Sequence, residues 1–174
     1  MLIMTADDIM EDVSLVMEII EHFGEDAFLQ DLSAQETSNP TRRDASQEEI
    51  YHLIMAAGWT TMLPEIFSPR PRSNSKLYQV FSDADDNGYY YYDDPTCDKE
   101  CKAVEFIYLA TAAYLGSRAD LFSDELTLKT RSALRKPLPN IVKIFESEAY
   151  VYPTKQWPNG RYKHSAKAIR LGER

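Results

Sequence analysis

Residues 103–115 read Ala-Val-Glu-Phe-Ile-Tyr-Leu-Ala-Thr-Ala-Ala-Tyr-Leu, and this stretch decides the fold. It is apolar almost all round a helix, and Glu105 is its only charged residue. Since a helix of this kind is buried, the pattern predicts a buried helix over residues 98–115. An ionised carboxylate is costly to bury alone. Glu105 therefore requires a metal ion, a cation such as Lys102, or a donor such as a tyrosine hydroxyl.

Apolar residues at helical spacing predict further helices around this one. We expect them over residues 5–23, over 44–57 with Gly58 as the stop, over 123–136 with Ser123 as the cap, and over 140–149. The other segments are predicted as a short strand or turn (27–32), a surface loop (64–76), a short helical turn (77–81) and an extended C-terminal tail (150–174). The fold class is therefore mainly α with minor β, as a single compact helical domain of residues 1–174.

The composition restricts the classes of function. The chain has 44% hydrophobic and 27% charged residues, which is the balance of a globular domain. Its formal net charge is −9, whereas a nucleic-acid binder needs a basic surface, so no nucleic-acid partner is expected. No apolar run is long enough to span a membrane. The protein is expected to be secreted if a signal peptide was removed, and cytoplasmic otherwise.

The strongest chemical pattern is Glu48-Glu49-x-x-His52. Glu48 and His52 are four residues apart, so on a helix they share one face and can hold one metal ion. The layout is that of the His-Glu-x-x-His helix of zinc hydrolases, with Glu48 in place of the first histidine and Glu49 as the general base. The alternative is structural, with Ser46 as a helix cap and Glu49 as its capping-box partner. Glu105 has the right chemistry to be the third metal ligand.

Two other patterns concern metals or cross-links. The stretch from Asp83 through Asp85 and Asn87 to Gly88 matches the start of a calcium-binding EF-hand loop, but a plain turn is the preferred interpretation because no suitable helix follows. Cys97 and Cys101 are the only cysteines. They are read first as a local disulfide, then as free thiols, and last as half of a metal site.

Several ordered blocks of the sequence resemble an uncharacterised family of zincin-like, metallopeptidase-like proteins from microbes and marine organisms. The blocks are Gln30-Asp31-Leu32 with Glu36-Thr37, residues 48–54 with Ala57-Gly58, Pro64-Glu65-Ile66-Phe67, residues 90–101 with both cysteines, Glu105-Phe106-Ile107-Tyr108 with Leu115-Gly116, and residues 152–162. The resemblance covers roughly residues 25–162. It implies that Glu48, Glu49, His52, Asp93, Asp94, the two cysteines and Glu105 belong to one shared site or scaffold.

The chain departs from that family in places. Leu109 stands where a tryptophan is expected, and Ser117 stands where a glutamine is expected. The region before residue 25 is shorter than in the family, which implies that an N-terminal part of the usual domain is missing.

The sequence therefore favours a metal-dependent, peptidase-like hydrolase that acts on a peptide or a small molecule. Glu48, His52 and Glu105 would hold a divalent metal, first of all zinc, and Glu49 would be the general base. Tyr162, or His164 beside it, would stabilise the oxyanion. The alternative is a non-catalytic interaction module that binds a structural ion or calcium. A di-iron carboxylate site is a third class, but it needs two Glu-x-x-His units and the chain offers one.

Overall fold

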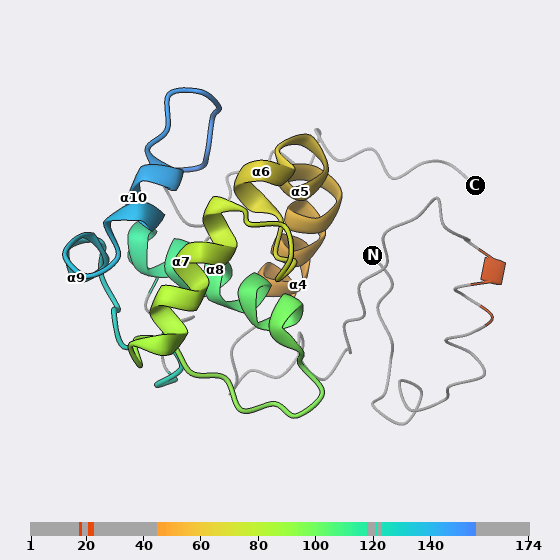
Figure 1. Ribbon diagram of the computed structural model, residues 1–174, viewed down its shortest axis with the longest axis horizontal. Helices are drawn as coiled ribbons and strands as arrows, with labels where there is room; N and C mark the ends of the chain where they lie inside the picture. Colours follow the sequence, from red (N-terminus) through yellow and green to blue (C-terminus); the bar gives the residue numbers. More distant parts are fainter. Residues whose placement is uncertain (1–17, 19–20, 23–44, 118–120, 122, 156–174) are drawn as a thin grey trace, which may run out of the picture.

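The computed structural model describes Glu18, Glu21, His22, residues 45–117, Leu121 and residues 123–155. This part of the chain is mainly helical, as the sequence predicts, and its helices form a compact arrangement (Figure 1). The elements are α4 (Ser46–Leu53), the π-helical segment η2 (Ile54–Trp59), α5 (Thr60–Met62), α6 (Pro64–Phe67), α7 (Lys76–Asp86), α8 (Lys99–Leu115), α9 (Arg131–Arg135) and α10 (Pro139–Phe145). The β structure found among these residues is one isolated antiparallel bridge, between Tyr90 and Leu126.

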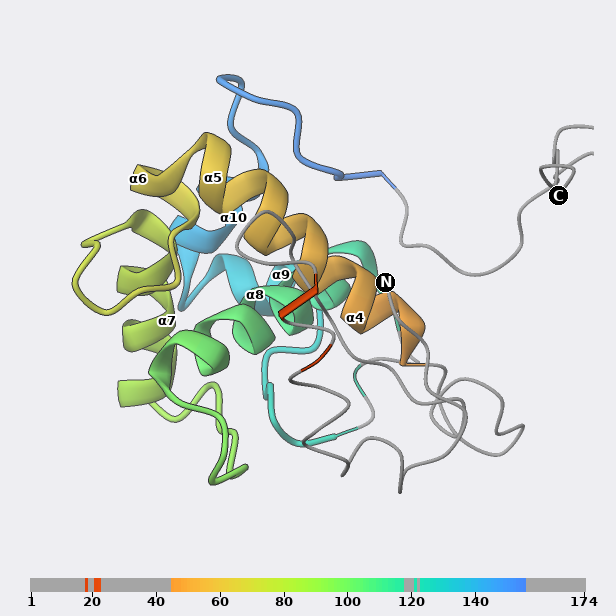
Figure 2. The same ribbon diagram turned by 90° about the vertical axis from the view of Figure 1, so that its right-hand side faces the viewer.

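Helix α8 is the centre of the described fold, as its apolar sequence predicts. It packs against α4, α7 and α9, and Figure 2 shows it between α7 and the rod formed by α4, η2 and α5. Every residue from Glu105 to Tyr114 is buried. The carboxylate of Asp98 caps the first turn by accepting from the backbone N–H groups of Glu100 and Cys101, both at 2.9 Å. Gly116 ends the helix in the left-handed conformation, with φ of 78°, as glycine readily does.

The helix predicted over residues 44–57 is present, but its predicted stop at Gly58 is wrong. Gly58 lies inside η2, and it does not take the left-handed conformation that a terminal glycine adopts. The helical rod continues to Met62 and ends at Leu63, where the following Pro64 disfavours a helical backbone. Trp59, the last residue of η2, packs on Phe67 with ring centroids 5.0 Å apart.

The surface loop predicted over residues 64–76 is only partly correct. Pro64 starts the short helix α6, a position that suits proline because the first helical N–H needs no partner. Ile66 and Phe67 of α6 are buried in the core. The short helical turn predicted over residues 77–81 is too short, since α7 runs to Asp86.

Two further boundaries differ from the prediction around the core. The helix predicted over 123–136 reduces to α9, because Leu126 is buried beside Tyr90 in the isolated bridge and residues 123–130 are not helical. The hydroxyl of Thr130, rather than Ser123, caps the helix by accepting from Ala133 N. The helix predicted over 140–149 is present as α10, but it ends at Phe145, and residues 146–149 are not helical. Most of the predicted helix 5–23 and all of the strand or turn 27–32 lie outside the described residues; Glu18, Glu21 and His22 are helical.

After α10, residues 151–154 have no regular secondary structure, and most of the predicted extended tail lies outside the described residues. Tyr152 is nonetheless buried, and its ring stacks on Phe145 at 4.8 Å between centroids. No helix in the described part of the chain is long and apolar enough to cross a membrane.

The cap of α8 gives a test of this fold. Asp98→Ala removes the acceptor for two backbone N–H groups, and we expect it to lower the free energy of unfolding by about 0.5–2 kcal/mol. Urea titration followed by circular dichroism measures this change. The control is Asp93→Ala, an exposed aspartate outside the helices, for which a change within about 0.5 kcal/mol is expected. An equal loss in both variants would contradict the capping role of Asp98.

Candidate metal centre

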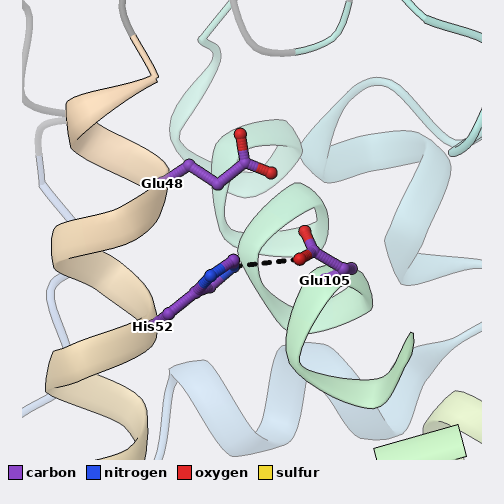
Figure 3. A group of neighbouring side chains, drawn as sticks. All are labelled: Glu48, His52 and Glu105. Atoms are coloured by element: carbon purple, nitrogen blue, oxygen red, sulfur yellow. Dashed lines mark ion pairs between the residues drawn. The ribbon is translucent and has the colours of Figure 1, made fainter. Parts of the chain in front are cut away.

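Helix α4 places Glu48 and His52 on the face that meets α8. The helix has Ala45 as its N-cap, with no side chain capping it, and Ser46 is already its first helical residue. The capping-box alternative, with Ser46 as the cap and Glu49 as its partner, is therefore wrong. Figure 3 shows the side chains of Glu48 and His52, one turn apart, directed toward Glu105 on α8.

A buried hydrogen-bond cluster fixes α4 against α8 next to this site. The hydroxyl of Tyr51 bonds to Thr111 Oγ1 at 3.0 Å and to the hydroxyl of Tyr152. Tyr152 also bonds to Thr111, at 2.7 Å. Because Tyr51 precedes His52 directly, this cluster sets the rotation of α4 that turns His52 toward Glu105. The ring of Tyr108, also on α8, contacts the His52 ring edge-on at 6.2 Å between centroids.

The three predicted metal ligands come together. Glu48, His52 and Glu105 each offer one ligand atom, and these atoms lie within 4.8 Å of one another. His52 Nε2 is 3.4 Å from Glu105 Oε1. Glu105 is 8% exposed, so this carboxylate is almost fully removed from solvent. No other group of this kind occurs within the described residues.

His52 Nε2 is the atom that points most directly to an ion. It is buried and makes no hydrogen bond, and its one close partner is the carboxylate of Glu105, with which the protonated imidazole forms an ion pair at 3.4 Å. A buried polar atom left without a hydrogen bond costs free energy and calls for an explanation such as a bound ion. Two ligand atoms at about 2.1 Å from one tetrahedral zinc are about 3.4 Å apart, which is the separation found here. The donor set therefore fits a divalent metal.

The other ring nitrogen of His52 also faces a carboxylate. His52 Nδ1 is 3.5 Å from Glu49 Oε2, within the same helix. Burial lowers the pKa of His52, but the carboxylates of Glu105 and Glu49 outweigh it and raise this pKa to about 10. Without a metal, His52 is thus a cation between acidic side chains. Coordination of a metal by Nε2 would take the place of the proton on that atom.

Tyr90 and Tyr92, which the sequence did not assign to the metal site, are influenced by the charge of Glu105. Burial raises the pKa of Tyr90 and of Tyr92, and the charge of Glu105 raises both further. Glu48 adds to the effect on Tyr92, so the Tyr92 hydroxyl lies in the field of two of the three candidate ligands. The hydroxyl of Tyr90 is buried without a hydrogen-bond partner. Their spacing of two residues in a non-helical segment was the available signal, because alternate residues of an extended chain share a side.

The remaining predicted site residues lie elsewhere. Asp83 and Asp85 are in the last turns of α7, and Asn87 caps its end by donating to the carbonyl of Asp83 at 2.7 Å. Both the EF-hand loop and the preferred plain turn are therefore wrong for residues 83–86, because the buried stripe Leu77, Val80, Phe81 and Ala84 keeps the chain helical. The turn is confined to Asn87 and Gly88. Tyr162 and His164 lie outside the described residues.

The segment before α8 is held by local contacts. Cys97 and Cys101 form a disulfide, the first of the three alternatives. The carboxylate of Asp94 accepts from the backbone N–H and the hydroxyl of Thr96, at 2.8 and 2.7 Å. Asp93 and Asp94 are exposed and are not members of the Glu48–His52–Glu105 group, so the shared site implied by the resemblance contains them at most as scaffold.

Comparison of the chain with protein-family models, with curated proteins and with solved structures finds no match. The resemblance to a zincin-like family stays a prediction, and the functional interpretation depends on the geometry of the site.

The contact that orients α4 can be tested directly. Tyr51→Phe removes the hydroxyl, and we expect a loss of about 1 kcal/mol in the free energy of unfolding, since Thr111 and Tyr152 keep their own hydrogen bond. Chemical denaturation measures the change. Tyr91→Phe is the matched control, because Tyr91 is 65% exposed, and it should change stability by less than about 0.5 kcal/mol. A neutral Tyr51→Phe would show that the cluster does not hold α4 in place.

Proposed function

We propose that this protein is a metal-dependent hydrolase, peptidase-like in its chemistry, with a divalent metal ion held by Glu48, His52 and Glu105. The observation that carries the proposal is the buried Nε2 of His52, which lacks a hydrogen bond and lies 3.4 Å from a carboxylate of a second helix. Three ligands contributed by two helices make a preformed site, since each side chain is positioned by the packing of α4 on α8.

The number of ligands favours catalysis over a purely structural role. Structural zinc sites are closed by four protein ligands, whereas catalytic sites use three and keep one position for water or substrate. A bound divalent metal would lower the pKa of such a water to about 7 and polarise a substrate carbonyl. The described residues supply three ligands, and the proposed substrate class is a peptide or another small molecule with a hydrolysable carbonyl group.

The donor set also indicates which metals fit. One imidazole and two carboxylates make a harder and more negative site than two histidines would. Zinc is the first choice, and manganese or iron suits the same set. Calcium prefers six to eight oxygen ligands, so it is a weaker fit to a site that contains His52 Nε2.

A non-catalytic metal-binding module is the second candidate. The observation that favours it is the contact of Glu49 with His52 Nδ1 at 3.5 Å, which engages the residue expected to act as the general base. In this case the ion would stabilise the packing of α4 on α8 without turning over a substrate.

Metal binding itself is the first prediction. Purified without chelators or a histidine tag, the wild-type protein should contain close to one divalent ion per chain, measured by elemental mass spectrometry. His52→Ala and Glu105→Gln should weaken zinc binding by at least about 100-fold, because each removes a direct ligand and even an outer-shell loss costs 10–100-fold. Asp85→Asn is the control, as this residue lies on α7 outside the group, and it should bind zinc like the wild type.

The absence of metal from the wild-type protein, with none taken up from zinc, manganese or calcium solutions, would refute the site. Equal loss of zinc in Asp85→Asn and in the ligand variants would place the ion elsewhere.

Hydrolysis separates the two candidate functions. We expect the zinc-loaded protein to cleave members of a peptide library, to lose this activity with a chelator, and to regain it when zinc is returned. Mass spectrometry of the peptides measures cleavage, with His52→Ala as the inactive control. Full zinc occupancy without any cleavage would favour the non-catalytic module.

A further inference from the structure

We propose that Glu49 is a positioning residue for His52 and not the general base of the site. Its carboxylate holds the Nδ1–H of the imidazole, and this contact directs Nε2 toward the metal position between Glu48 and Glu105. The inference rests on the proposed metal site, whose hydrolase-helix pattern would give Glu49 the other role.

The two nitrogens of His52 meet carboxylates from different directions. Nδ1 is 3.5 Å from Glu49 Oε2, while Nε2 is 3.4 Å from Glu105 Oε1. The first contact lies within α4, and the second crosses to α8. The ring therefore has a carboxylate at each nitrogen, and only Nε2 is paired with a member of the Glu48–His52–Glu105 group.

Helix geometry explains why Glu49 and Glu48 have different roles. Nδ1 is bonded to the ring carbon that carries the Cβ atom, so it stays near the backbone of α4 and is within reach of a side chain three residues earlier. Nε2 is at the far end of the ring and reaches the neighbouring helix (Figure 3). Glu48, four residues before His52, is directed toward the same side of α4 as Nε2 and belongs to the ligand group (Figure 3).

The chemistry of metal sites fits this arrangement. A metal-bound histidine usually donates its second N–H to a carboxylate, a carbonyl or a water, which fixes the tautomer and the orientation of the ring. Glu49 has the position and the charge for that task. A general base must instead lie within hydrogen-bond reach of the water on the metal. That water would be on the Nε2 side of the ring, whereas the carboxylate of Glu49 contacts the Nδ1 side.

Metal affinity distinguishes the two roles. Loss of an outer-shell partner costs about 10–100-fold in metal affinity, whereas loss of a general base leaves affinity unchanged. We therefore expect Glu49→Ala to raise the Kd for zinc by about 10–100-fold. Glu49→Gln should raise it less, since the amide oxygen still accepts from Nδ1–H. Glu65→Gln, an exposed glutamate on α6, is the control and should bind zinc like the wild type.

The measurement is competition of each full-length variant with a chromophoric chelator for zinc alone. Nitrogen-15 NMR of the zinc-loaded protein adds a readout that a general loss of stability would not move. In the wild type the Nδ1 signal of His52 should be that of a protonated, hydrogen-bonded nitrogen. Glu49→Ala should shift this signal, and Glu49→Gln should restore it in part.

The outcomes separate the inference from the proposed function. Wild-type Kd values in both Glu49→Ala and Glu49→Gln, with hydrolysis lost, would overturn the inference and restore Glu49 as the general base while the metal site stands. Failure of the wild-type protein to bind zinc would refute the metal site itself, and the positioning role with it.

Discussion

Glu105 places a carboxylate in the most deeply buried helix of the described fold, and the packing of the neighbouring helix α4 brings a partner for this charge next to it. A lone ionised group in such a place would cost too much free energy to persist. His52 on α4 is the partner of this carboxylate, with Nε2 at 3.4 Å from Glu105 Oε1. Because the partner stands on another helix, the charge of Glu105 links the chemistry of the site to the packing of α4 on α8.

That packing is set by contacts outside the site. The hydroxyls of Tyr51, Thr111 and Tyr152 form a closed buried cluster whose members lie on α4, on α8 and in the non-helical segment after α10. Hydrogen bonds between buried hydroxyls are directional, so they fix rotation as well as distance. Tyr51 and His52 are adjacent on α4, and the rotation that seats the first directs the second toward Glu105. The rings of Phe67 and Phe145 stack on Tyr152 and hold this segment against the core.

The site contains more carboxylates than a single imidazole can neutralise, and this excess of negative charge explains why it suits a divalent ion. Glu48, Glu49 and Glu105 surround a single imidazole, which in the absence of a metal carries the compensating positive charge. A divalent ion compensates the carboxylates better, because it brings two charges and needs lone pairs of the kind that Nε2 provides. Nε2 of His52, which is buried without a hydrogen bond, would then be a ligand of the ion. Glu49, on the other side of the ring, keeps the imidazole in the orientation that coordination requires.

The sequence by itself determined the helical class, the buried helix α8 and the pairing of Glu48 with His52, because these follow from spacing along one helix. It also singled out Glu105, since a charge within an apolar run needs a partner wherever it lies. Only the tertiary structure decided which partner that is, because α4 and α8 are far apart in the chain. The direction of Glu49 toward Nδ1 and the helical state of Asp83 to Asp86 depend likewise on side-chain packing. Local patterns record which groups can meet on one element, and packing between elements decides which of them do.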